Sequence, residues 1–302
     1  GQLRTFQRRV SCWRAQNCEQ TAVLPQVHRP GEVLQADGTW LTALGVTIQG
    51  VPLKHLLVHC VLTYSNWEWG RVAQSESLGA IKLGVQSTLQ ELGYVPQFIQ
   101  TDNSGAATHV LQADEEEGTE RERGYTPGYL SFLGEYGLEP RTTHVCSPHE
   151  NGDVESSNGG LKRAIKQHLL LRGSRDFDSI ESYEAFLFGV MERRNRGRQQ
   201  RLAEEQAVMK PLPPVSLATY REVKVSVSRQ GTIRVVRNLY SVPTSLIGHT
   251  VTVRIYEWHL EVHYGGKLME TMPRLIGSRK HQINYRHLID TLLRKPGGFR
   301  DY

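Results

Sequence analysis

The sequence predicts a mixed α/β domain, a helical connector and a small C-terminal β-barrel. Three features of the 302-residue chain support this fold class. Through residues 31–172 the apolar patterns of strands and helices follow one another, beginning with three strands and ending with a long helix. Helical patterns then continue to Ala207, and Pro211, Pro213 and Pro214 mark a linker. Beyond this linker the apolar residues recur at every second position, as they do in short β-strands.

Composition restricts the class of protein. The chain has no apolar run near eighteen residues and no signal-peptide pattern, so we expect a cytoplasmic protein without a membrane span. The four cysteines form no CxxC pair, which argues against a zinc knuckle or a disulfide framework. Residues 1–155 contain 11 Lys and Arg against 18 Asp and Glu, whereas residues 156–302 contain 25 against 13. This asymmetry favours a polyanionic partner beside an acid-rich site, although basic surfaces also occur for solubility alone.

The first elements are expected in the following order. An amphipathic basic helix over 3–16 comes first, and a polar connector with Pro25 and Pro30 follows it. The next strand, over 32–37, is expected to stop at Gly38. Further strands are predicted over 53–64, 67–72, 96–101 and 138–145, and helices over 76–92 and 127–137. The charged stretch 112–126 lacks apolar spacing and predicts a surface loop or a disordered insertion.

A long helix is predicted from Val154 onward, after Pro148, Asn151 and Gly152 break the chain. Its apolar stripe consists of Val154, Leu161, Ile165 and Leu169. Glu155 is off this stripe and shares a side of the helix with Asn158, Lys162 and Lys166. A solvated charged face would explain this side of the helix, and so would one acid that holds a metal next to lysines that hold phosphates.

The C-terminal third contains five or six short strand patterns between Val223 and Met272, with a hairpin at Gly265-Gly266. These patterns predict a small β-barrel. A last amphipathic helix is expected over Tyr285–Arg294.

Three acids occupy informative positions. Asp37 is expected at or near the end of the first strand, Asp102 directly after the fourth, and Glu155 in the first turn of the long helix. In α/β sheets, strand ends and helix starts present side chains into a shared crevice. Three carboxylates there would repel one another without a cation, and they could bridge two Mg²⁺ ions for an in-line displacement at phosphorus. Each acid also has a simpler explanation, because Asp often forms turns, and Asp153 can cap the helix.

Several motifs carry a resemblance to a known family. The order of Asp37, TDNSGAA around Asp102 and SPHENGDVE around Glu155 resembles the retroviral-integrase-like DDE transposases, which have an RNase H-like fold. The likeness is closer to the transposase of the IS21 family of bacterial insertion sequences. It extends over nearly the whole chain through TFQRRVSCWRA, VTIQG, LTYSNWEW, LLRGSRDF and NLYSVP.

The resemblance implies a function and a set of partners. It implies that Asp37, Asp102 and Glu155 are the catalytic triad and bind two Mg²⁺ or Mn²⁺ ions. It implies cleavage at transposon ends and transfer of the 3′-hydroxyl ends into target DNA. The implied partners are double-stranded DNA, further copies of the chain as a dimer or tetramer on paired ends, and a AAA+ ATPase for target selection. On DNA the protein would associate with the bacterial nucleoid.

The resemblance also divides the chain. We expect an N-terminal basic helix and connector (1–30), an RNase H-like catalytic domain (31–172), a helical connector and linker (173–214), a small β-barrel (215–276), and a C-terminal helix and tail (277–302). Family members begin with helix-turn-helix domains, so we expect the chain to be a core fragment without them.

Candidate DNA contacts lie on two basic helical stretches. Residues that share a helix with the third acid, or belong to the dense arginine stretch 191–201, could grip backbone phosphates. They are Asn158, Lys162, Arg163, Lys166, Arg193, Arg194, Arg196 and Arg198. Two alternatives to a transposase remain open: a structure-selective nuclease of the same fold that cleaves without joining, and a domesticated DNA-binding or assembly protein without catalysis.

Overall fold

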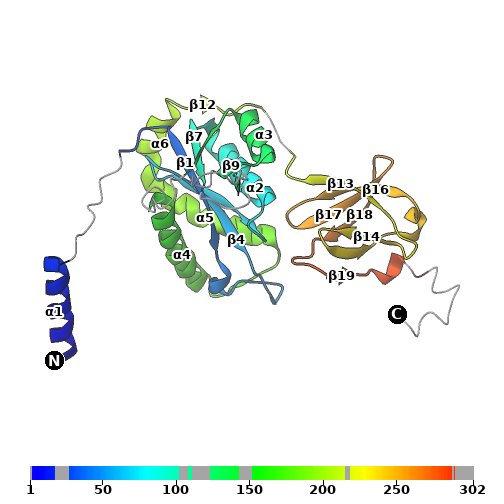
Figure 1. Cartoon of the computed structure of the whole chain (residues 1–302), viewed down its shortest axis with the longest axis horizontal. Helices are drawn as coiled ribbons and strands as arrows, with labels where there is room; N and C mark the ends of the chain where they lie inside the picture. The colour runs from blue at the N-terminus through cyan, green and yellow to red at the C-terminus, as the bar shows by residue number, and fades with distance from the viewer. Residues whose placement is uncertain are drawn as a thin grey trace, which may run out of the picture.

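The computed structural model describes residues 2–17, 27–101, 108–110, 123–142, 152–214, 218–287 and 289. The predicted N-terminal helix is confirmed as α1 (Gln2–Asn17), which Figure 1 shows apart from the rest of the chain. Its apolar side is open to solvent, since Phe6 is 67% and Trp13 is 60% exposed.

A five-stranded mixed sheet forms the centre of the first folded unit. Its strand order is β10-β7-β1-β4-β5. The bounds are β1 Val33–Trp40, β4 Leu56–Leu62, β5 Glu68–Ala73, β7 Phe98–Thr101 and β10 Glu139–Thr142. The first three in sequence pair antiparallel, and β7 and β10 join the sheet parallel to β1. The predicted RNase H-like mixed sheet is therefore confirmed.

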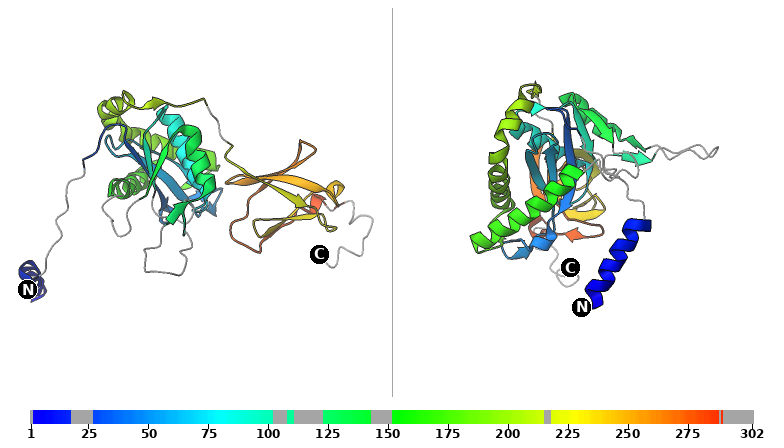
Figure 2. Two further views of the ribbon diagram at one scale, coloured as in Figure 1. Left: turned by 45° about the horizontal axis from the view of Figure 1, so that its top comes forward. Right: turned by 90° about the vertical axis from the view of Figure 1, so that its left-hand side faces the viewer.

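Helices cover both faces of this sheet. On one face lies α2 (Leu78–Leu92), which begins at the capping residue Ser77 and ends at Gly93, whose φ is +73°. The helix α3 (Pro127–Tyr136) packs beside it, with Lys82 over the ring of Phe132. The other face carries α4 (Gly152–Arg172) and α5 (Ile180–Asn195). In the right-hand view of Figure 2, α4 crosses in front of β1.

The predicted apolar stripe of α4 is confirmed. Val154, Leu161 and Ile165 are each at most 1% exposed, and Leu169 is 2% exposed. A short 3₁₀ turn (Arg196–Arg198) then leads from α5 into α6 (Gln199–Gln206), so helices follow α4 as predicted, and residues of both helices belong to the apolar core of the first unit.

Two sequence predictions are wrong in detail. The first strand does not stop at Gly38 but continues to Trp40, because Gly38, Thr39 and Trp40 pair with β4. The charged stretch 112–126 does not end as a loop, because β9 (Arg123–Tyr125) pairs with β8 (Thr108–Val110).

Other short pairings were not predicted at all. They join β2 (Thr47–Ile48) to β3 (Val51–Pro52) and β11 (Asp176–Phe177), and β6 (Tyr94–Val95) to β12 (Lys210–Pro211). Two or three residues are too few to show a period.

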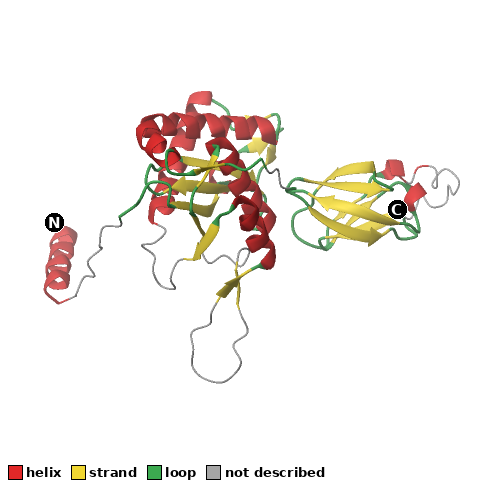
Figure 3. Ribbon diagram, turned by 90° about the horizontal axis from the view of Figure 1, so that it is seen from above, coloured by secondary structure: helices red, strands yellow, loops and turns green. Residues whose placement is uncertain are grey.

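The C-terminal unit consists of strands around a second apolar core (Figure 3). One sheet has the order β13-β16-β17-β18 and the other β14-β15-β19. The bounds are β13 Arg221–Ser226, β14 Thr232–Val235, β15 Asn238–Ser241, β16 Thr250–Ile255, β17 His259–Tyr264, β18 Lys267–Pro273 and β19 His281–Gln282. Gly265 and Gly266 both have positive φ and form the predicted hairpin turn.

The two units share a polar contact. The backbone N–H of Gln74, the residue directly after β5, donates to the buried carboxylate of Glu257 in the C-terminal unit at 2.7 Å. Arg274 lies 3.3 Å from that carboxylate. Of the helix predicted over Tyr285–Arg294, the described part contains a 3₁₀ turn at Tyr285–His287, and most of the remainder lies outside the described residues. The domain boundaries drawn from the sequence stay predictions. In the part of the chain that the structure describes, no helix has both the length and the apolarity to cross a membrane.

Candidate active site

Asp37 lies inside β1, at a half-buried position on the sheet. Side chains alternate along a strand, so Gln35 and Asp37 share one face, and both contact α4. Asp37 also lines an open pocket of about 250 Å³ together with Gly38, Glu76 and Thr101. The carboxylate therefore lies between α4 and the sheet, at the edge of the pocket.

The second predicted acid follows the strand next to β1. Thr101 ends β7 and pairs with Ala36, the residue before Asp37. Asp102 is the next residue in the sequence after Thr101, and it lies outside the described residues.

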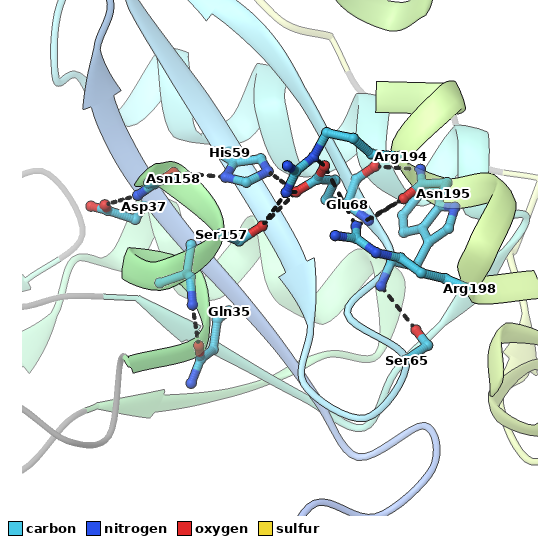
Figure 4. Close-up of polar contacts among 12 residues, drawn as sticks. Gln35, Asp37, His59, Ser65, Glu68, Ser157, Asn158, Arg194, Asn195 and Arg198 are labelled. Carbon is cyan, nitrogen blue, oxygen red and sulfur yellow. Dashed lines mark hydrogen bonds and ion pairs between the residues drawn. The ribbon is translucent and has the colours of Figure 1, made fainter. Parts of the chain in front are cut away.

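The first two turns of α4 are attached to β1 at two points. The Val154 N–H, which has no partner within the helix at this position, donates to Gln35 Oε1 at 3.1 Å. One turn later, Asn158 Nδ2 donates to Asp37 Oδ2 at 2.8 Å. The backbone of Glu155 lies between these two contacts, in the first turn as predicted, while its side chain is not described. Figure 4 shows both attachments.

The amide of Asn158 also binds His59, a fully buried residue of β4 that lies opposite Asp37 in the strand register. Asn158 Oδ1 is 2.7 Å from His59 Nδ1. A carboxylate only accepts, so the amide nitrogen must face Asp37 and the amide oxygen must face His59. His59 Nδ1 therefore carries a hydrogen and donates it to Asn158.

Beyond His59 the polar chain reaches Glu68, at the start of β5. His59 Nε2 lies 3.3 Å from Glu68 Oε2, and both side chains are 0% exposed. Ser157 of α4 donates to the same oxygen at 2.5 Å. From α5, Arg194 donates to Glu68 through Nε and through Nη2, the latter at 3.1 Å, and Arg198 lies 3.5 Å away. These partners from α4 and α5 surround the carboxylate (Figure 4).

The charge of Glu68 is stabilised by its surroundings. Burial by itself raises the pKa of the Glu68 carboxyl, but the contacts with His59 and Arg194 and the charge of Arg198 lower it by more than burial raises it. The resulting pKa lies well below its ordinary value. The backbone is held as well, because Asn195 Oδ1 accepts from the Glu68 N–H at 3.0 Å and Asn195 Nδ2 donates to the Glu68 carbonyl at 2.8 Å.

A glycine of α4 makes room for the arginine. A Cβ at Gly160 would lie 3.1 Å from Arg194 Nη1, which is tighter than ordinary contact. The Gly159-Gly160 pair, unusual inside a helix, is therefore explained in part by the passage of Arg194.

The predicted DNA-binding residues fall into two groups. The side chains of Asn158, Arg194 and Arg198 belong to the network around Asp37 and Glu68. The other five are partly or fully exposed: Lys162, Arg163, Lys166, Arg193 and Arg196. A DNA-binding role stays a prediction for both groups.

The described part of the site fits a hard divalent cation in its chemistry. Asp37 offers carboxylate oxygen, the ligand type that Mg²⁺ prefers, at the edge of a pocket. Among the described residues, no group of three or more His, Cys, Asp and Glu could hold a metal ion. Of the three predicted ligands, only Asp37 has a described side chain.

Sequence analysis missed Gln35, His59 and Glu68. Each lies in a predicted strand, and each is at most 2% exposed. Polar residues inside nearly continuous apolar strands are a usable signal, because buried polar groups require partners. The sequence does not show which partners they have.

Comparisons with known proteins find similarity to transposases. A family model described as the C-terminal domain of Mu transposase matches residues 212–284. An uncharacterized protein of Sinorhizobium fredii is 37% identical over 302 residues, covering 98% of this chain and 59% of that protein. A putative transposase for insertion sequence IS408 of Burkholderia multivorans is 25% identical over 280 residues, covering 87% of this chain and 51% of that protein. The chain thus spans a little over half the length of these relatives.

The match to one solved structure covers most of the chain. The chain is similar to a protein in the cryo-electron microscopy structure of a simian T-cell lymphotropic virus intasome bound to the PP2A regulatory subunit B56 gamma. The identity is 14%, the TM-score is 0.48, and the match covers 85% of this chain and 82% of the other. The fold assignment itself rests on the strand order given above.

Proposed function

We propose that this chain, which is similar to insertion-sequence transposases, performs the cleavage and strand-transfer chemistry of an IS21-type transposase. The proposed metal ligands are Asp37, Asp102 and Glu155. The observation that supports this most is the attachment of α4 to β1 on both sides of Glu155, with Asn158 bound to Asp37 itself.

The residues of the chain have distinct proposed roles. When bound, two Mg²⁺ or Mn²⁺ ions would supply activation of the attacking oxygen and stabilisation of the leaving oxygen at a phosphodiester. Asp37 contributes a carboxylate whose orientation is set by the hydrogen bond from Asn158. Gln35 fixes the start of α4, and with it the backbone at Glu155.

Contacts to DNA are proposed for the exposed basic residues. Arg163, Lys166, Arg193 and Arg196 are open to solvent on α4 and around the end of α5, and phosphate contacts there would position DNA without reading its sequence. Assembly as a dimer or tetramer on paired ends is part of the proposal. The AAA+ ATPase partner and nucleoid association stay predictions from the resemblance.

A joining assay with the third acid changed tests the proposal. With any missing end-binding domains restored, the wild-type chain with pre-cut transposon ends, a free 3′ hydroxyl and Mg²⁺ should give strand-transfer product, and Glu155→Gln should give none. DNA binding should stay within about twofold, because the substitution changes one side chain and leaves the exposed basic residues in place. The matched control is Glu192→Gln, which changes an exposed glutamate of α5.

The alternatives give different results in the same assay. Cleavage without any joined product from the wild type would indicate a nuclease. Undiminished joining by Glu155→Gln would refute the assignment of that residue. No reaction with the wild type and no metal binding in calorimetry would indicate a non-catalytic DNA-binding protein.

A further inference from the structure

A chain of polar contacts begins at Asp37 and continues well beyond the proposed metal ligands. It passes from Asp37 through Asn158 and His59 to Glu68, and there meets Arg194. The chain crosses β1, α4, β4, β5 and α5, and Figure 4 shows it as one continuous line of contacts.

Stability alone does not explain these residues. The side chains of His59 and Glu68 are 0% exposed. Leu57 and Val61, which flank His59 in β4, are also fully buried. Removing charges from water costs several kcal/mol per ion, and well-packed apolar residues often replace a buried ion pair without loss of stability. What apolar residues cannot supply is a fixed direction at each bond.

The direction matters most at Asn158. Its amide can be turned over, which would place the oxygen of the amide against the Asp37 carboxylate. Asp37 and His59 lie at the two ends of this amide, so an accepting carboxylate at one end and a hydrogen on His59 Nδ1 at the other select the same sense, with oxygen facing His59 and nitrogen facing Asp37. Glu68 lies against the other ring nitrogen and keeps the ring in place, and Arg194 and Ser157 hold Glu68.

We propose that His59 and Glu68 are positioning residues for the Asp37 carboxylate and act on it through Asn158. This inference rests on the proposed role of Asp37 as a metal ligand. Residues that orient a ligand from behind change metal affinity about 10- to 100-fold when they are lost.

The test measures Mn²⁺ binding to the 302-residue chain by calorimetry, with Asp37→Asn as the reference for binding without this ligand. His59→Phe keeps a planar ring but removes both nitrogens, and should weaken Mn²⁺ binding about 10- to 100-fold. Glu68→Gln should act in the same direction. Strand transfer, measured in parallel, should need a correspondingly higher metal concentration.

Two further variants separate positioning from general damage. His55→Phe changes another histidine with 0% exposure, whose ring contacts Tyr183 and Leu53, and should leave Mn²⁺ binding unchanged. His59→Asn keeps an amide nitrogen at the same number of bonds from Cα as Nδ1, and should recover part of the affinity. Thermal unfolding of each variant shows whether the fold is retained.

The outcomes distinguish the two proposals. If wild type and Asp37→Asn bind Mn²⁺ equally, the proposed metal site fails. If Asp37 is required but His59→Phe binds as tightly as wild type, the positioning role fails while the metal site stands. Equal losses in His55→Phe and His59→Phe, without recovery in His59→Asn, would also overturn the positioning role.

Discussion

The two faces of the central sheet are covered in opposite ways. On one face α2 packs by shape, with Gly84 directly against Val58 and Leu89 fully buried. On the other face α4 and α5 are joined to the sheet by the polar chain from Asp37 to Arg194. The second face contains the buried charge of Glu68.

The titratable groups reflect this difference. Facing α2, burial raises the pKa of the Cys60 thiol to about 12, so the thiol is neutral and acts as an apolar residue. On the face covered by α4, burial raises the pKa of Glu68 as well, but the partners of the carboxylate more than reverse this shift.

Apolar packing on the α2 face therefore supplies stability, whereas polar contacts on the α4 face set the orientation of individual side chains. Apolar contacts are nearly non-directional and respond to volume. Hydrogen bonds respond to the identity of each partner. Substitutions on the two faces should therefore fail in different ways.

The largest expected effect is the loss of the charge at the centre of the polar chain. Glu68→Ala leaves Arg194 and His59 without their partner and should lower the free energy of unfolding by about 3–5 kcal/mol. Denaturant titration followed by tryptophan fluorescence measures it. Glu192→Ala, at an exposed position on α5, is the control and should change stability by less than about 0.5 kcal/mol. Equal effects in both variants would show that burial of Glu68 is unimportant.

The next effect is a cavity on the apolar face. Leu89→Ala should lower the free energy of unfolding by about 3 kcal/mol, because the 0% exposed side chain leaves a space that its neighbours fill only partly. Leu89→Met conserves volume and should cost less than about 1.5 kcal/mol. If the methionine variant lost as much stability as the alanine variant, the packing of α2 would not be governed by volume.

A smaller effect is expected where α2 approaches β4. A Cβ at Gly84 would lie 2.4 Å from Val58 Cγ1, so Gly84→Ala should destabilise by about 2 kcal/mol through overpacking. Gly84→Ala combined with Val58→Ala should recover part of this loss in the same titration. An additive double variant would contradict the direct clash.

The smallest effect concerns pH. Folding lowers the pKa of Glu68 from its ordinary value of 4.5, so this group contributes its full stability above pH 4.5 and loses it as pH falls below. The difference in unfolding free energy between wild type and Glu68→Gln should shrink as pH falls from about 4.5 toward pH 3. A difference that stays constant throughout, or grows in acid, would contradict the ionised state of Glu68.

Much of the fold is visible in the sequence because periodicity reports burial. The helix over 76–92, the buried strand β4 and the stripe of α4 follow from apolar spacing alone. Glu155 lies in the first turn of α4 as predicted, although the helix begins at Gly152, two residues before the predicted start at Val154.

The candidate site could be predicted only in part, because its contacts depend on strand register and on distant segments. Asp37 and His59 face each other through the pairing of β1 with β4, and Arg194 reaches Glu68 from 126 residues away. Asn158 was assigned to a polar side of the helix, yet it is 7% exposed, because its amide binds two polar partners on the sheet, Asp37 and His59. The spacing of residues in the sequence does not predict these contacts.

The double attachment of α4 to β1 fixes the rotation of the helix as well as its position. A slip of one residue would turn the helix by about 100° and carry position 155 away from β1. Because the anchors are Gln35 and Asp37, both in the sheet, this setting does not depend on the number of residues that connect β10 to α4.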